Sequence, residues 1–289
     1  MIRHSLVRAL AALAGAMLVV TVLAPAPAAS AQDASATPDN APTYYVALGD
    51  SLSVGFMPGM GDTDQGYADD YYATLKAKHP NLQLIKLGCS GETSKTMLNG
   101  GICTYDNAPS QMVAAEQFLQ QHRSAVRYIT IDIGANDVAK CAKSGIDLNC
   151  ALTGLSDILV NTVSIMTKLR LAGGLRPTIV GMNLYNPFLA AWLTGPDGQT
   201  SARITNALLA LLNGLQSVEF TLFGARTADV AAAFNTYDFD HTVEVPSYGA
   251  IPVNVATICA LTYMCTQHNI HPTAEGYQLI ASAFVKVAS

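Results

Sequence analysis

The feature that most constrains the fold is a short apolar run that stops abruptly at a glycine. Residues 44–48 are aromatic and aliphatic, which predicts a buried strand, and Gly49 and Asp50 end it. Ser51 therefore lies where a strand gives way to a turn. Because open parallel sheets bind ligands beyond the carboxyl ends of their strands, Ser51 is a candidate nucleophile. The alternative is that its hydroxyl only caps the helix that follows.

Two further apolar runs end in the same manner. Residues 82–87 lead into the turn 88–94, which contains two glycines. The main-chain N–H groups of such a turn can bind an anion or a developing negative charge, although most turns of this kind are only turns. Residues 127–133 lead into Gly134 and Asn136. The Asn136 amide either forms an Asx turn or presents its N–H groups to the same crevice as Ser51.

The rest of the chain shows further strand and helix patterns, and no linker-like break follows Thr43. We therefore expect one domain from 43 to 289. Two segments, 186–193 and 234–248, are predicted to be loops, and the first is unusually apolar and contains the only tryptophan, Trp192. The patterns predict strands over 44–48, 82–87, 127–133, 178–184 and 225–231, and helices over 67–78, 112–122, 155–169, 200–215 and 277–285.

The N-terminus has the layout of a secretory signal. Arg3 and Arg8 precede an apolar run over 9–24, and small residues follow it. That run is short for a membrane span, and no later segment looks long and apolar enough to be one. We expect a signal peptide over 1–31, with cleavage after Ala36 as the second choice. A disordered leader over 32–42 and a secreted protein without stable membrane insertion are also expected.

Charge argues against nucleic acid as a partner. The chain has 16 basic and 21 acidic side chains, a formal net charge of −5. Loss of residues 1–31 removes two of the basic side chains and none of the acidic ones. An acidic exported protein without a basic cluster is a poor nucleic-acid binder.

Six cysteines in an exported chain favour disulfides. Six allow 15 pairings, among which the sequence alone cannot strictly choose. They nevertheless fall into three local couples, and no Cys-x-x-Cys spacing suggests a zinc site. The expected pairs are Cys89 with Cys103, Cys141 with Cys150, and Cys259 with Cys265.

The C-terminal segment supplies a candidate base. His271 and Pro272 stand just before the helical stripe over 277–285, which places His271 at the start of a helix. Lone histidines are usually structural, but an imidazole at this position can take the proton of a serine hydroxyl near neutral pH.

Four blocks in this order resemble the SGNH hydrolases, also called the GDSL esterase/lipase family. They are Gly49–Leu52, Ser90–Thr93, Gly134–Asp137 and His271–Pro272. The three local cysteine pairs resemble those of the exported actinobacterial-type members of the family. The resemblance implies a three-layer α/β/α sandwich with a five-stranded parallel sheet. It also implies Ser51 as nucleophile and His271 as base, with no metal and no cofactor. The implied oxyanion hole combines the main-chain N–H groups of Ser51 and Gly91 with Asn136.

One position departs from the family pattern. Many members carry an aspartate three residues before the histidine, and here that position is His268. We expect a main-chain carbonyl near His268 to orient His271, because some members use one. Asp238, Asp240 and Glu275 are the carboxylate alternatives, ranked below it.

The resemblance implies a secreted esterase or lipase that hydrolyses carboxylic esters through an acyl-enzyme. Carbohydrate acetylesterase and phospholipase activity at the same site are alternatives. Outside this class, His241, His268 and His271 leave open a non-enzymatic metal- or ligand-binding protein, but the metalloprotease pattern His-Glu-x-x-His is absent. The α/β-hydrolases require a Gly-x-Ser-x-Gly elbow, which does not surround Ser51.

We expect the apolar segment 186–193 to line a fatty-acyl pocket, with core packing as its alternative. We also expect a monomer.

Overall fold

The computed structural model describes residues 41–142 and 147–288, which belong to one unit of the chain, residues 40–289. The expected signal peptide and all but the last two residues of the expected leader lie outside the described residues.

The centre of this unit is a five-stranded parallel sheet, as predicted. Its strand order is β2-β1-β3-β4-β5, and every neighbouring pair is parallel. The chain passes from β1 to β2 on one side and then returns to place β3, β4 and β5 on the other side. The connections after β1 and after β2 therefore lead in opposite directions. Ligands of such sheets bind at this point. The strands are β1 (Thr43–Gly49), β2 (Leu82–Lys86), β3 (Val126–Asp132), β4 (Thr178–Met182) and β5 (Arg226–Ala228).

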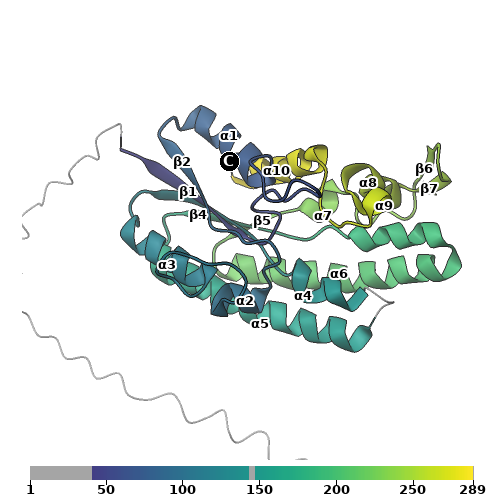
Figure 1. Cartoon of the computed structure of the whole chain (residues 1–289), viewed down its shortest axis with the longest axis horizontal. Helices are drawn as coiled ribbons and strands as arrows, with labels where there is room; N and C mark the ends of the chain where they lie inside the picture. The colour runs from purple at the N-terminus through teal and green to yellow at the C-terminus, as the bar shows by residue number, and fades with distance from the viewer. Residues whose placement is uncertain (1–40, 143–146, 289) are drawn as a thin grey trace, which may run out of the picture. The chain divides into compact units, whose positions relative to one another are not determined.

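Alternating side chains of β1 create two hydrophobic cores, one on each face of the sheet. Tyr45 and Ala47 join the core beneath α1 (Tyr67–Lys78) and α10 (Ala274–Ala288). Val46 and Leu48 join the core beneath α3 (Gln111–Gln121), α5 (Leu148–Gly173) and α6 (Pro196–Leu222). Figure 1 shows these two groups of helices on opposite sides of the sheet. The result is the expected three-layer α/β/α sandwich.

Several connecting segments differ from the sequence-based expectation. The fifth strand ends at Ala228, and a helical turn follows it because Asp229 caps the next backbone N–H groups. The expected loop over 234–248 contains one strand of an antiparallel hairpin. The expected loop over 186–193 is a 3₁₀ helix, η2. The remaining elements are α2 (Ser94–Asn99), α4 (Ala135–Ala139), η1 (Lys140–Ala142), η2 (Pro187–Thr194), α7 (Val230–Ala233), β6 (Thr242–Val245), β7 (Gly249–Pro252), α8 (Val253–Leu261) and α9 (Met264–Gln267).

The three predicted disulfides are confirmed. Cys89–Cys103, Cys141–Cys150 and Cys259–Cys265 have Cα–Cα distances of 6.0, 5.5 and 5.0 Å. These distances lie within the range that a disulfide can bridge. The first pair follows β2 and the last pair joins α8 to α9, so both fix segments at the carboxyl edge of the sheet.

One expectation about membranes needs correction. By length and composition, the 26-residue helix α5 is long and apolar enough to cross a bilayer. Core helices of other proteins pass the same test, and α5 contributes Ile165, Met166 and Leu169 to the core between sheet and helices.

Candidate active site

Ser51 follows directly on β1 because the backbone makes a sharp turn at Gly49. Gly49 has φ +140°, and a Cβ built there would lie 2.2 Å from the main-chain oxygen of Asp132. Only glycine fits such a close approach. The Ser51 side chain, at 7% relative exposure, lies at the carboxyl edge of the sheet.

His271 reaches Ser51 from the other end of the chain. Its Nε2 lies 2.8 Å from the Ser51 Oγ, across 220 residues of sequence. The loop that carries His271 is closed by an antiparallel β-bridge between Thr262 and Pro272. The main-chain N–H of Tyr263 also donates to the main-chain oxygen of His271 at 3.0 Å. The two residues that the sequence assigns as nucleophile and base are therefore in direct contact.

The group behind His271 is not the predicted one. His271 Nδ1 lies 2.6 Å from the side-chain oxygen of Asn269, so the expected main-chain carbonyl near His268 is wrong. A side-chain amide occupies this place. Asp238 bonds His241 instead, and within the described residues no hydrogen bond joins Asp240 or Glu275 to His271. The family pattern does not point to Asn269, because its aspartate lies three residues before the histidine and Asn269 lies two residues before it.

Burial lowers the pKa of His271 to about 4, and only a weaker opposing effect comes from the charge of Asp62. Removing an imidazolium from water disfavours its charged form. His271 is therefore neutral at neutral pH, which is the state a general base requires.

The three expected oxyanion-hole groups lie near one another but differ in how they are held. Among the described residues, no acceptor engages the main-chain N–H of Ser51 or of Gly91. The Asn136 amide nitrogen donates to the Glu92 main-chain oxygen at 2.9 Å, while its contact with Asp50 is 3.4 Å long. One amide hydrogen thus fixes the side chain, and the other is only weakly engaged.

A pair of buried carboxyl groups lies beneath the nucleophile. The Asp50 main-chain N–H donates to Asp132 at 3.2 Å, and the Tyr67 hydroxyl donates to the other Asp132 oxygen at 2.5 Å. Burial raises the pKa of Asp50 to about 6 and that of Asp132 well above its usual value, with the nearby Asp50 charge adding to the latter. Burial and the neighbouring Asp50 charge both favour the protonated form of Asp132.

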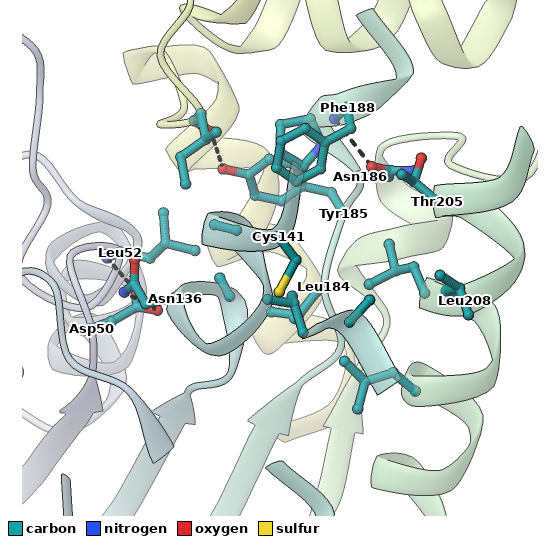
Figure 2. A pocket seen from close by; sticks show the side chains of 18 of the residues that line it. Asp50, Leu52, Asn136, Cys141, Leu184, Tyr185, Asn186, Phe188, Thr205 and Leu208 are labelled. Atoms are coloured by element: carbon teal, nitrogen blue, oxygen red, sulfur yellow. Dashed lines mark hydrogen bonds between the residues drawn. The ribbon is translucent and has the colours of Figure 1, made fainter. Parts of the chain in front are cut away.

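An apolar pocket of about 100 Å³ extends from these residues into the helical layer. Ser51, Asn136 and His271 line one end of it, whereas Gly91 is not among the lining residues. Figure 2 shows Asp50 and Asn136 beside one another on one side and Leu208 of α6 on the other. The walls between them are mainly aliphatic: Val138, Leu155, Leu184, Leu208, Leu209 and Leu212.

The apolar segment around Trp192 meets its expectation only in part. Pro187 and Phe188 line the pocket. Trp192 does not, because its ring packs 5.5 Å from Phe239 and lies under the Arg203 guanidinium. Both of the alternatives considered for this segment therefore apply, to different residues of it.

The model of the GDSL-like lipase/acylhydrolase family matches residues 47–279, which is most of the chain. The chain belongs to this family. It is thus a carboxylic ester hydrolase, and the family's matched region includes all four blocks that carry the resemblance. No curated protein matches this sequence.

Solved structures share the fold of this GDSL-family chain at low sequence identity. An acetyl xylan esterase, AlAXEase, is 12% identical, with a TM-score of 0.52 over 84% of this chain and 98% of the other. A lipase/acylhydrolase from Enterococcus faecalis is 13% identical, with a TM-score of 0.51 over 84% and 94%. A phospholipase A1 from Streptomyces albidoflavus NA297 is 19% identical, with a TM-score of 0.49 over 85% and 99%.

The histidines considered for a metal site do not gather in this GDSL-family fold. His241 pairs with Asp238 at 3.0 Å, His268 is exposed, and His271 faces Ser51. Across residues 41–142 and 147–288, no group of three or more His, Cys, Asp or Glu side chains is arranged to hold a metal ion.

Proposed function

We propose that this GDSL-family protein is a secreted serine esterase or lipase that hydrolyses carboxylic esters through an acyl-enzyme. Ser51 is the nucleophile and His271 the general base. The observation that carries the proposal is the 2.8 Å contact between Ser51 Oγ and His271 Nε2 at the mouth of the apolar pocket. A serine hydroxyl is a weak nucleophile until an adjacent base takes its proton, and this contact supplies the base.

The reaction proceeds in two halves. Ser51 Oγ attacks the ester carbonyl carbon as its proton moves to His271 Nε2, and the tetrahedral intermediate collapses when His271 returns that proton to the leaving alcohol. Water then enters, gives a proton to His271 and attacks the acyl-Ser51 carbonyl. The carboxylic acid departs as Ser51 recovers its proton.

The negative charge of the tetrahedral intermediate falls on the former carbonyl oxygen. The main-chain N–H groups of Ser51 and Gly91 can donate to it without first breaking another bond. The second hydrogen of the Asn136 amide only has to leave its long contact with Asp50. Preorganised donors of this kind commonly supply about 3–4 kcal/mol each to the transition state.

The substrate's acyl group occupies the apolar pocket. Beyond the polar end near Ser51, the aliphatic walls offer little hydrogen bonding to a sugar but suit a hydrocarbon chain. This favours fatty-acyl esters over acetylated polysaccharide. Secretion is supported by the signal-like N-terminal sequence and by three disulfides, which persist in oxidising compartments.

The test is a double-mutant cycle on p-nitrophenyl ester hydrolysis. Ser51→Ala and His271→Ala should each lower kcat by at least about 10³-fold, and the double variant should be no worse than either single one, because the two groups act as a unit. His268→Asn is the control, since His268 is exposed and its positive φ suits asparagine. Additive losses, or a Ser51→Ala variant with near wild-type kcat, would refute the assignment.

A further inference from the structure

The Asn269 side chain occupies the place behind His271 Nδ1 that the aspartate occupies in a Ser-His-Asp triad. We propose that Asn269 is the positioning residue of the catalytic histidine, and that its side-chain oxygen holds His271 in the tautomer that can accept the serine proton. This inference rests on the proposed roles of Ser51 and His271. It adds to them a neutral third member in place of a carboxylate.

Two donors identify the amide atom that faces His271. The same Asn269 atom lies 3.0 Å from the main-chain nitrogen of His271 and 2.6 Å from its Nδ1. A main-chain N–H can only donate, so the atom it meets is the oxygen of the amide and not its NH₂ group. An amide oxygen can only accept, so the Nδ1 beside it carries the ring hydrogen. Nε2 then presents its lone pair to the Ser51 hydroxyl.

The orientation of the amide decides whether the site works. With the NH₂ group turned toward the ring, Nδ1 would have to accept, and the hydrogen would sit on Nε2. Such a ring cannot take the serine proton. In a serine protease, exchanging the triad aspartate for asparagine produces this wrong tautomer and costs about 10⁴ in kcat. Here the turn formed between Asn269 and the His271 N–H selects the productive orientation.

The loop that carries both residues is fixed at several points. The Asn269 N–H donates to the main-chain oxygen of Tyr263 at 3.4 Å, and the Tyr185 hydroxyl donates to the Ile270 oxygen at 2.7 Å. The Cys259–Cys265 disulfide ties α8 to α9 immediately before this loop. The positive φ of His268, 52°, makes the turn between α9 and Asn269. The geometry is thus preorganised by elements on three sides.

Because the Asn269 amide is neutral, it adds no negative charge beside the His271 ring. The charge that acts on the His271 pKa is that of Asp62, from the loop after β1. Asp50 and Tyr185 line the same pocket as His271, and the Tyr277 hydroxyl of α10 donates to the Phe56 main-chain oxygen. The Phe56 ring, whose centroid lies 4.5 Å from that of His271, contributes to its burial. Without a carboxylate on Nδ1, burial dominates, and the pKa of His271 falls to about 4. The free enzyme therefore keeps its base neutral in mildly acidic solution.

The experiment compares Asn269→Asp and Asn269→Ala with the wild type and with His268→Asn. For each variant, kcat and KM are measured from about pH 3 to about pH 9, and the pKa of His271 is followed by NMR. Asn269→Asp keeps the acceptor but adds a charge, so the acid limb of kcat/KM and the NMR pKa should both rise by roughly 1–3 units. Asn269→Ala should lower kcat by about 10²-fold or more, with KM within a few-fold of wild type. His268→Asn should leave both unchanged.

Two results would overturn the inference: an acid limb for Asn269→Asp that coincides with wild type, or an Asn269→Ala variant that keeps kcat within about threefold. If the alanine variant does not fold, as judged by circular dichroism, the aspartate variant decides alone, because its carboxylate still accepts the His271 N–H. Failure of the proposed function would look different. Ser51→Ala would then retain activity, whatever the effect of changes at Asn269.

Discussion

At the scale of single residues, the buried carboxyl pair beneath the nucleophile makes stability depend on pH. A carboxyl group whose pKa is raised by folding stabilises the folded state only while it is protonated. That contribution is complete below the unfolded pKa and is lost as pH rises through the folded one. The pKa of Asp50, raised to about 6, and that of Asp132, raised well above its usual range, therefore predict falling stability from mildly acidic to alkaline pH.

Asp132→Asn should flatten this decline. The amide is a permanent counterpart of the protonated carboxyl group: its oxygen can accept from the Asp50 main-chain N–H, and its NH₂ can donate to the Tyr67 hydroxyl oxygen. Each unit of pKa shift corresponds to about 1.4 kcal/mol, so the change is large enough to follow by thermal unfolding between about pH 5 and about pH 9. Parallel loss of Tm in wild type and variant would show that the pair is not the cause.

The same scale shows why most of the site was predictable and one residue was not. Ser51, Asn136 and His271 stand at strand ends or at a helix start, where sequence patterns are informative. Asn269 carries no such signal. Its role comes from an Asx turn that places one oxygen between a main-chain N–H and an imidazole, and only coordinates show that arrangement. An asparagine two residues before a candidate base is nevertheless a readable clue.

At the scale of elements, the sequence predicted those marked by a continuous apolar run, such as β1 and β4, or by a helical spacing of apolar residues. The helix over 67–78 and all five parallel strands were placed to within a few residues. Among the missed elements, α4, α9 and the two strands of the β6–β7 hairpin are each four or five residues long. Their local patterns are too short to show a period, and tertiary packing determines them.

If the acyl group occupies the pocket as proposed, helix α6 limits its length, and Leu208→Trp tests this. The half-buried Leu208 lies on the α6 side of the pocket, so a larger ring there should shorten it. We expect kcat/KM for p-nitrophenyl octanoate to fall at least about tenfold, with that for the acetate nearly unchanged. Leu211→Trp is the matched control, because Leu211 is 54% exposed on the same helix. Equal losses for both esters, or the same selectivity change in the control, would contradict this assignment.

At the scale of the whole molecule, the parallel sheet brings together residues from opposite ends of the chain. Because β1 lies between β2 and β3, the turns after these three strands meet at one edge, with Ser51, Gly91 and Asn136 on them. His271, in the loop just before α10, contacts Ser51 although the two residues are 220 positions apart in the sequence. The sequence order of the blocks predicted this assembly, since parallel strands end on the same side. The pocket behind it depends on how α5 and α6 pack, which no motif specifies.

The most direct test of the central claim is labelling of the intact protein with a p-nitrophenyl alkylphosphonate, followed by peptide mass spectrometry. We expect a single phosphonate on Ser51, with loss of esterase activity in proportion to labelling. We also expect no label in Ser51→Ala and slow labelling in His271→Ala, because the base must activate the hydroxyl. A phosphonate on another residue, or full inhibition without modification of Ser51, would contradict the account.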